Sequence, residues 1–156
     1  MIVCEFEDGG EAKLRHVTVG AIAVNEKKKV LLIRRASKHR FGKYSIPGGF
    51  LDRDEDAKAA TLRELREETG YDAKINFLFR VNDNPKRPKE DRQNVDLLYI
   101  VKITNGKPTL NKEVSEIKWF SEADLPEDED FAFDHRDTII KYFQYLSRQF
   151  TLPILG

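Results

Sequence analysis

PGGFLDRDEDAKAATLRELREETGY, residues 47–71, is the stretch that decides the fold: a loop with paired glycines, one helix and a stop signal. Asp54 and Glu55 stand where an N-cap and a first helical turn favour side-chain oxygens and negative charge. Gly70 stands where a helix commonly ends in left-handed backbone. The pattern therefore predicts a helix from about Glu55 to Thr69.

Three glutamates of this helix are predicted to share one face. At 100° per residue, Glu64, Glu67 and Glu68 fall within about a third of the circumference. Their charges repel one another at roughly 0.2–0.5 kcal/mol per pair and oppose the helix macrodipole, so local physics disfavours the arrangement. A broken local rule points towards function, whereas the default explanation for such a run is a solvated charged face.

The residues ahead of the helix favour the functional interpretation. Gly48 and Gly49 allow a ligand to approach the backbone closely. Clustered carboxylate oxygens are the ligands that a hard cation such as Mg²⁺ requires. A glycine turn followed by a face of glutamates is therefore a candidate metal site.

The chain resembles the Nudix hydrolase family, whose box reads G-x(5)-E-x(7)-R-E-U-x-E-E-x-G-U. Every fixed position is matched at the correct spacing, by Gly49, Glu55, Arg63, Glu64, Leu65, Glu67, Glu68 and Gly70. Tyr71 departs from the pattern, which has an aliphatic residue there, but this position packs rather than reacts. The resemblance extends to residues 30–35, 42–49 and 113–120.

The residues and the resemblance together predict the fold class. Strands alternating with two helical segments imply an α/β domain. The resemblance specifies a Nudix-like α/β/α sandwich with a mixed β-sheet, in a single domain over residues 1–156. Apolar and β-branched runs predict strands, and an amphipathic pattern predicts a second helix. The expected strands are residues 17–24, 30–35, 75–81, 95–104 and 117–120, and the second helix is residues 134–150.

Two further segments have distinctive patterns. Residues 1–16 are expected to form an N-terminal hairpin, in which the strands 2–7 and 11–16 flank the turn Asp8-Gly9-Gly10. Residues 82–93 contain Pro85 and Pro88 among charged side chains, and they are expected to form an exposed loop. Loops of this kind often select the substrate.

The resemblance also implies a metal site. It implies that Glu64, Glu67 and Glu68 bind one or more Mg²⁺ ions, with Mn²⁺ as a substitute, aided by the backbone carbonyl of Gly49. Either Glu67 or Glu68 would orient or deprotonate the attacking water, and this choice stays open. Glu113 resembles an auxiliary metal ligand.

Three arginines and one glutamate complete the expected site. Arg63 and Glu55 have opposite charges and are two helical turns apart, so we expect them to pair and to orient the metal-binding carboxylates and the loop. Arg35 lies where several Nudix proteins hold a substrate phosphate, and guanidinium groups bind phosphate oxygens bidentately. Arg34 is the alternative, and a solvated loop is an equally good explanation for each.

The expected function is hydrolysis of a phosphoric anhydride. The favoured substrates are ADP-ribose or a nucleotide sugar, in which a nucleoside diphosphate is linked to another group; Pro85, about fourteen residues after the box, is a mark of the ADP-ribose group. One alternative is a nucleoside triphosphate pyrophosphohydrolase that cleans the nucleotide pool. Another is a nucleotide-sensing module without catalysis, although the intact box argues against it.

Composition limits the remaining classes of protein to which the chain can belong. Lys plus Arg and Asp plus Glu are both 27, so the net charge is zero and nucleic-acid binding is not indicated. Cys4 is the only cysteine, which excludes an intrachain disulfide. No apolar run approaches the roughly 20 residues that span a bilayer, and no signal peptide is evident, so we expect a cytoplasmic protein. The expected partner is a small nucleotide, and a homodimer is left open.

Overall fold

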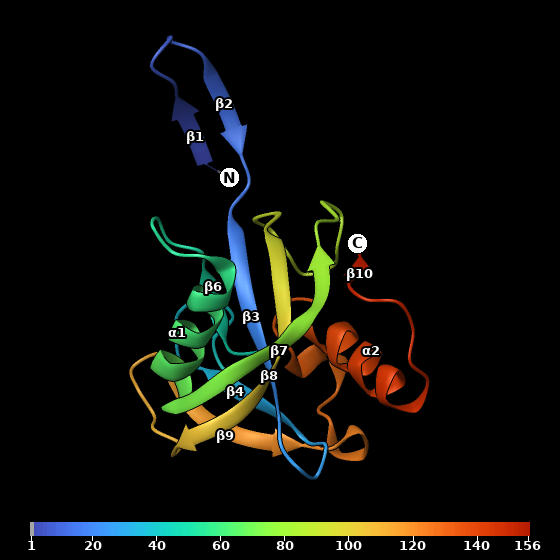
Figure 1. Cartoon of the computed structure of the whole chain (residues 1–156). Helices are drawn as coiled ribbons and strands as arrows, with labels where there is room; N and C mark the ends of the chain where they lie inside the picture. Colours follow the sequence, from blue (N-terminus) through green and yellow to red (C-terminus); the bar gives the residue numbers. More distant parts are fainter. Residues whose placement is uncertain (1) are drawn as a thin grey trace.

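The computed structural model describes residues 2–156, whose core is a mixed β-sheet between two helices (Figure 1). The strand order in the described chain is β10-β7-β8-β3-β4-β5, with β6 also paired to β3 and β9 to β4. The strands are β3 (Val17–Val24), β4 (Val30–Arg35), β5 (Tyr44–Ser45), β6 (Gly48–Phe50), β7 (Tyr71–Asn82), β8 (Val95–Gly106), β9 (Val114–Phe120) and β10 (Ile154–Leu155).

The centre of the sheet is the parallel pair β3 and β8. Val17 pairs with Val95, and the register continues to the pair Val24 and Lys102. The neighbouring pairs β7–β8, β3–β4 and β4–β9 are antiparallel, so the sheet is mixed as predicted. We expected β8 to have one strongly apolar face, but its middle, Leu98 to Val101, is buried on both faces because each face is covered by a helix.

The two helices cover opposite faces of the sheet, as Figure 1 shows. Helix α1 (Ala57–Thr69) packs through Leu65 on Ala21, Leu31 and Val101. Helix α2 (His135–Ser147) packs on the other face in a larger cluster, which includes Ile22, Leu32, Phe79, Ile100, Ile139 and Tyr142. Burial of one such side chain contributes about 1.5–3 kcal/mol. The predicted α/β/α sandwich is confirmed, and no helix among residues 2–156 is long and apolar enough to cross a membrane.

Helix α1 begins later than predicted. Asp56 is the N-cap, and its Oδ1 accepts hydrogen bonds from the backbone N–H groups of Lys58 at 2.9 Å and Ala59 at 2.8 Å. The prediction of Asp54 and Glu55 as cap and first turn is wrong, because Asp54 has left-handed backbone with φ 69° whereas an N-cap needs extended backbone. The predicted stop is confirmed: Gly70 has φ 75° and its N–H donates to the carbonyl of Arg66.

The predicted N-terminal hairpin is present and projects from the body of the molecule (Figure 1). Its strands, β1 (Ile2–Glu5) and β2 (Glu11–Leu14), are antiparallel with Cys4 opposite Ala12. Both strands are shorter than expected. Met1 belongs to the same prediction and lies outside the described residues.

Several boundaries differ from the sequence prediction for one reason. Strand β7 begins at Tyr71 rather than Ile75, and β8 continues to Gly106, because the two strands pair along their whole length from Tyr71 opposite Gly106. Strand β4 ends at Arg35 as predicted, and β9 pairs with it there. Partner strands distant in sequence set these strand ends. Helix α2 also differs from the prediction, since it ends at Ser147 rather than Phe150.

The segment between β7 and β8 is partly buried, so the prediction of an exposed loop is wrong for its middle. The Arg87 side chain is only 3% exposed. Its guanidinium binds Asp96 at 2.6 Å and Glu90 at 3.0 Å, and Asp134 lies 3.9 Å away. A charged side chain is stable in the interior only when it is paired, and here three carboxylates surround it.

Candidate active site

Glu68, in the last turn of α1, is the buried member of the glutamate face. It is 8% exposed, and its Oε2 accepts a hydrogen bond of 2.8 Å from the backbone N–H of Gly48 in β6. Burial raises the pKa of Glu68 to about 8, and the charges of Glu64 and Glu113 act in the same direction. The Gly48 N–H and Arg35 oppose this shift. Glu68 can therefore hold or release a proton near neutral pH.

Glu64 lies one turn earlier and faces the same strand. A Cβ at position 49 would lie 2.5 Å from the Glu64 carboxylate, so only glycine lets the helix approach β6 this closely. Burial raises the pKa of Glu64, while its hydrogen bond with Arg63 opposes the increase. The carboxylates of Glu64 and Glu68 are thus both held against the backbone of β6.

Arg63 joins the helix to the loop that precedes it. Its guanidinium binds both oxygens of Glu55, at 2.7 and 3.0 Å, and its Nη1 binds Glu64 at 2.8 Å. It also donates to the carbonyl of Phe50 at 3.2 Å. The hydrogen bonds from Arg63 to Glu55 lower the pKa of Glu55 to about 2. The expected pairing of Arg63 with Glu55 is present.

Glu67 and Glu113 lie at the open side of the cluster. The Glu67 side chain is 59% exposed and lies 3.3 Å from Nη1 of Arg63. Glu113 is exposed on the loop before β9, where its carbonyl accepts a hydrogen bond from Ala36. The charge of Glu113 contributes to the raised pKa of Glu68.

The donor set fits a hard divalent cation, although it is not assembled into a ready metal cage. Within residues 2–156, no three His, Cys, Asp or Glu side chains form a group that could hold a metal ion. Arg63 binds Glu64 and Glu67, and the Gly48 N–H donates to Glu68. The donors are nevertheless all oxygens, which suits Mg²⁺ or Mn²⁺. A cation would also replace the proton that burial favours on Glu68.

A cavity of about 110 Å³ lies beside this cluster, between β3, β6, the segment before β8 and the start of α2. Arg35 lines it, as do Gly48 and Gly49. The Arg35 guanidinium donates to the carbonyl of His39 at 3.1 Å and to Oγ of Ser37 at 3.1 Å, and it lies over the ring of Phe133. Burial lowers the pKa of Arg35, and the charges of Glu68 and Glu113 oppose that shift.

Arg34 belongs to the other face of β4. It lies over the ring of Tyr44, 5.7 Å from its centroid, and donates to the carbonyl of Gly42 at 2.9 Å. The Tyr44 hydroxyl donates in turn to Glu116 at 2.7 Å. Arg35 lines the cavity, whereas Arg34 is not among its lining residues.

Several lining residues were missed by the sequence analysis. They include His39, Asn94, Asp96, Phe133 and His135. The Nδ1 of His135 accepts a hydrogen bond of 3.1 Å from the N–H of Ile46. The available signal was the polar pair Asn94 and Asp96 at the start of an apolar strand. Phe133 has φ 55°, a strained conformation for a bulky residue that occurs mainly at functional sites.

Comparison with known proteins gives a consistent result. The model of the NUDIX domain matches residues 14–142. An ADP-ribose pyrophosphatase of Methanocaldococcus jannaschii is 30% identical over 131 residues, which cover 83% of this chain and 75% of the relative.

Two solved structures share the fold at higher than 25% identity. The NUDIX hydrolase from Nitrosomonas europaea has a TM-score of 0.78 and 27% identity, covering 95% of this chain and 80% of the other. The NUDIX domain of Shewanella oneidensis NrtR, solved with ADP ribose, has a TM-score of 0.67 and 26% identity, covering 86% and 90%. The matched box, the sandwich and these likenesses agree: the chain belongs to the Nudix family and is an enzyme that acts on pyrophosphate bonds.

Proposed function

We propose that this enzyme hydrolyses the diphosphate linkage of ADP-ribose or a nucleotide sugar, with Mg²⁺ as cofactor and Mn²⁺ as a substitute. The observation that carries the proposal is the contact of two glutamates of α1 with the glycine backbone of β6, directly beside a cavity that Arg35 lines. The Methanocaldococcus jannaschii relative is named for ADP-ribose, and the Shewanella oneidensis domain was solved with ADP ribose. Both support this substrate class.

The proposed metal ligands are Glu64, Glu67, Glu68 and the carbonyl of Gly49, with Glu113 as an auxiliary ligand. When bound, a divalent cation neutralises charge on the phosphate oxygens and lowers the pKa of water. Without a cation, burial raises the pKa of Glu68 to about 8, so the fold makes this carboxylate more basic than an ordinary glutamate. We therefore assign proton removal from the attacking water to Glu68.

Arg63 and Glu55 are assigned as positioning residues. Arg63 fixes Glu64 and Glu67 while its bidentate pair with Glu55 anchors it to the loop. Preorganised carboxylates avoid reorganisation during the reaction, which is a large part of the advantage of an enzyme site. Arg35 is assigned to a phosphate of the substrate, because its guanidinium borders both the cavity and the glutamates.

A panel assay tests the function. The purified protein is incubated with Mg²⁺ and ADP-ribose, UDP-glucose, dinucleoside polyphosphates and nucleoside triphosphates in turn, and the products are separated by ion exchange. We expect AMP and ribose 5-phosphate from ADP-ribose, and no turnover in the presence of chelator. Release of pyrophosphate from a triphosphate as the fastest reaction would support the alternative, a nucleoside triphosphate pyrophosphohydrolase. Binding of ADP-ribose without any turnover would indicate a sensing module.

A further inference from the structure

Asn94 combines burial with a place in the lining of the cavity. It immediately precedes β8, is only 7% exposed and lines the cavity. Its buried Oδ1 has no hydrogen-bond partner among residues 2–156. Buried polar atoms in folded proteins are almost always paired, because an unsatisfied acceptor retains the full cost of losing water. An acceptor left free in a ligand cavity therefore indicates that a ligand donor satisfies it.

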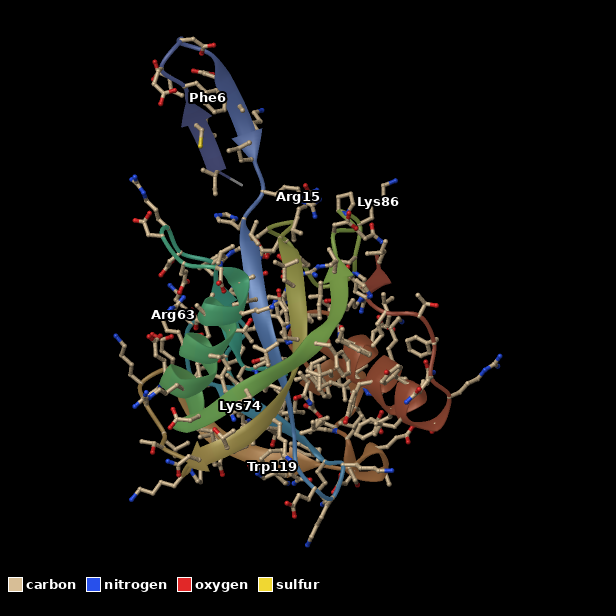
Figure 2. All side chains as sticks on the ribbon, viewed as in Figure 1. Phe6, Arg15, Arg63, Lys74, Lys86 and Trp119 are labelled. Carbon is tan, nitrogen blue, oxygen red and sulfur yellow. The ribbon has the colours of Figure 1, made fainter. Side chains whose placement is uncertain are left out.

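The backbone around Asn94 is held from both sides, so its placement is built into the fold. Arg15 donates to the carbonyl of Gln93 and to that of Asn94, the latter at 3.2 Å. The N–H of Val95 donates to the carbonyl of His16 at 2.9 Å. Figure 2 shows Arg15 where the N-terminal hairpin joins the body, beside the loops at that end of the sheet. Hydrogen bonds from the residues at the base of the hairpin thus fix the backbone of the segment that carries Asn94.

The next residues on the same face of the strand differ from Asn94 in being satisfied. Asp96 accepts hydrogen bonds from Thr18 Oγ1 and binds Arg87 at 2.6 Å. Leu98 follows as an apolar wall. Of these three alternating positions, Asn94 is the one whose polar group is left for a ligand.

The cavity suits a flat ring. Its volume of about 110 Å³ is below the roughly 300–1,000 Å³ of sites that enclose a whole ligand, so it holds one part of a nucleotide. Its walls include Val19, Ile46, Leu98 and Phe133. Polar side chains, among them His39, Glu90 and Arg92, line the rest of the cavity. A nucleobase offers apolar faces to the first kind of wall and a polar edge to the second. Under the proposed function the diphosphate lies beside Gly48 and Arg35, which line the same cavity.

We propose that Asn94 is a specificity-determining residue whose side-chain oxygen accepts a hydrogen bond from the exocyclic amino group of the substrate's nucleobase. Asparagine pairs in this way with amino-bearing base edges elsewhere, as with adenine. The inference rests on the proposed function and names the base class that the same site prefers. Arg15 acts as a positioning residue for Asn94.

Equilibrium binding of mononucleotides tests the inference without requiring turnover. The probes are AMP and IMP, which differ by an amino or an oxo group, CMP and UMP, which differ in the same way, and ribose 5-phosphate, which has no base. Each is titrated calorimetrically into the wild type, Asn94→Leu, which keeps the side-chain shape without hydrogen-bonding groups, and Asn94→Ala. Asn105→Leu is the matched control, since Asn105 is exposed at the other end of β8.

We expect the wild type to bind the amino member of at least one pair about tenfold more tightly than the oxo member. Both Asn94 variants should lose this difference and leave ribose 5-phosphate binding unchanged, while Asn105→Leu keeps it. The inference is overturned if the wild type does not discriminate within either pair, or if discrimination survives in the Asn94 variants. Equal loss of ribose 5-phosphate binding would also overturn it, because Asn94 would then act on the sugar or on the fold.

Failure of this inference and failure of the proposed function give different results. A protein that hydrolyses ADP-ribose but shows no amino preference keeps the function and loses the role of Asn94. A protein that shows the amino preference through Asn94 but hydrolyses nothing in the panel keeps the base site and loses the proposed substrate class.

Discussion

At the scale of single residues, burial separates the three glutamates that the helix places on one face. Glu68 is enclosed beneath β6, whereas Glu67 is largely exposed. The Glu68→Gln variant keeps an oxygen for the Gly48 N–H but loses the negative charge and the basic site. We expect kcat for ADP-ribose to fall by about 10²-fold or more, the scale on which single acid–base and electrostatic groups act.

Steady-state kinetics with saturating Mg²⁺ measures this effect. Glu122→Gln is the matched control, because Glu122 is exposed in a short 3-10 helix after β9, and its kcat should equal that of the wild type. Thermal melts add an independent readout: Mg²⁺ should raise the Tm of the wild type more than that of Glu68→Gln. Wild-type activity in Glu68→Gln would assign Glu68 to a structural charge network instead.

Arg34 and Arg35 are a natural matched pair, adjacent in sequence and on opposite faces of β4. Loss of a charged hydrogen bond costs about 1.5–3 kcal/mol, so Arg35→Ala should raise KM for ADP-ribose by roughly 10- to 100-fold. Arg34→Ala removes the contact with Tyr44 and should leave KM unchanged. The two variants are compared by initial rates, and a larger KM effect from Arg34→Ala would reverse the assignment.

At the scale of elements, the sequence pattern and the folded structure place the N-cap of α1 at different residues. Asp56→Ala removes the acceptor of two backbone N–H groups and should lower the free energy of unfolding by about 1 kcal/mol. Asp54→Ala should change it by no more than about 0.5 kcal/mol, because the Asp54 carboxylate is exposed beside Arg53.

Urea denaturation of both variants in chelator decides between the two caps. The slope m should stay the same, since neither change alters the surface exposed on unfolding. If Asp54→Ala proves the more destabilising, the cap predicted from the sequence alone is the correct one and the observed start of α1 is not.

At the scale of the whole molecule, His135 links helix α2 to the sheet and makes stability depend on pH. The protein atoms around its ring lower the pKa of His135 from 6.5 to about 4, although Asp96 and Asp134 oppose the shift and Arg87 and Arg35 add to it. Between these pH values the unfolded chain binds a proton that the folded chain does not. The contribution of His135 to stability therefore decreases as the pH falls from about 6.5 towards 4, while Glu68, whose pKa burial raises to about 8, contributes in the opposite direction.

The expected loss attributable to this histidine is on the order of 2 kcal/mol, less than the full shift implies because His135 borders the cavity. Urea unfolding at pH 7 and pH 4.5 measures it in the wild type and in His135→Asn. The variant should be less stable at pH 7 and lose less stability on acidification. An equal loss in both proteins would show that other groups cause the acid sensitivity.

Much of the architecture was predictable because it depends on contacts close in sequence. The spacing of Glu64, Glu67 and Glu68 follows from the 3.6-residue helical period, and the stop at Gly70 follows from its tolerance of left-handed backbone. Runs of β-branched residues likewise predicted β3 and β4, and the turn at Gly9 predicted the hairpin. The spacing of the box also predicted the family.

Tertiary structure alone decided which side chains meet at the site. The burial of Glu68 needs β6 to lie against the end of α1, and only the folded cavity shows that Arg35 rather than Arg34 lines it. Asn94 reaches the cavity because β8 lies parallel to β3, which joins residues about 78 positions apart, as in the pair Val17 and Val95. Local periodicity determined which faces this sequence could present, and strand pairing over long separations determined which face became the cavity.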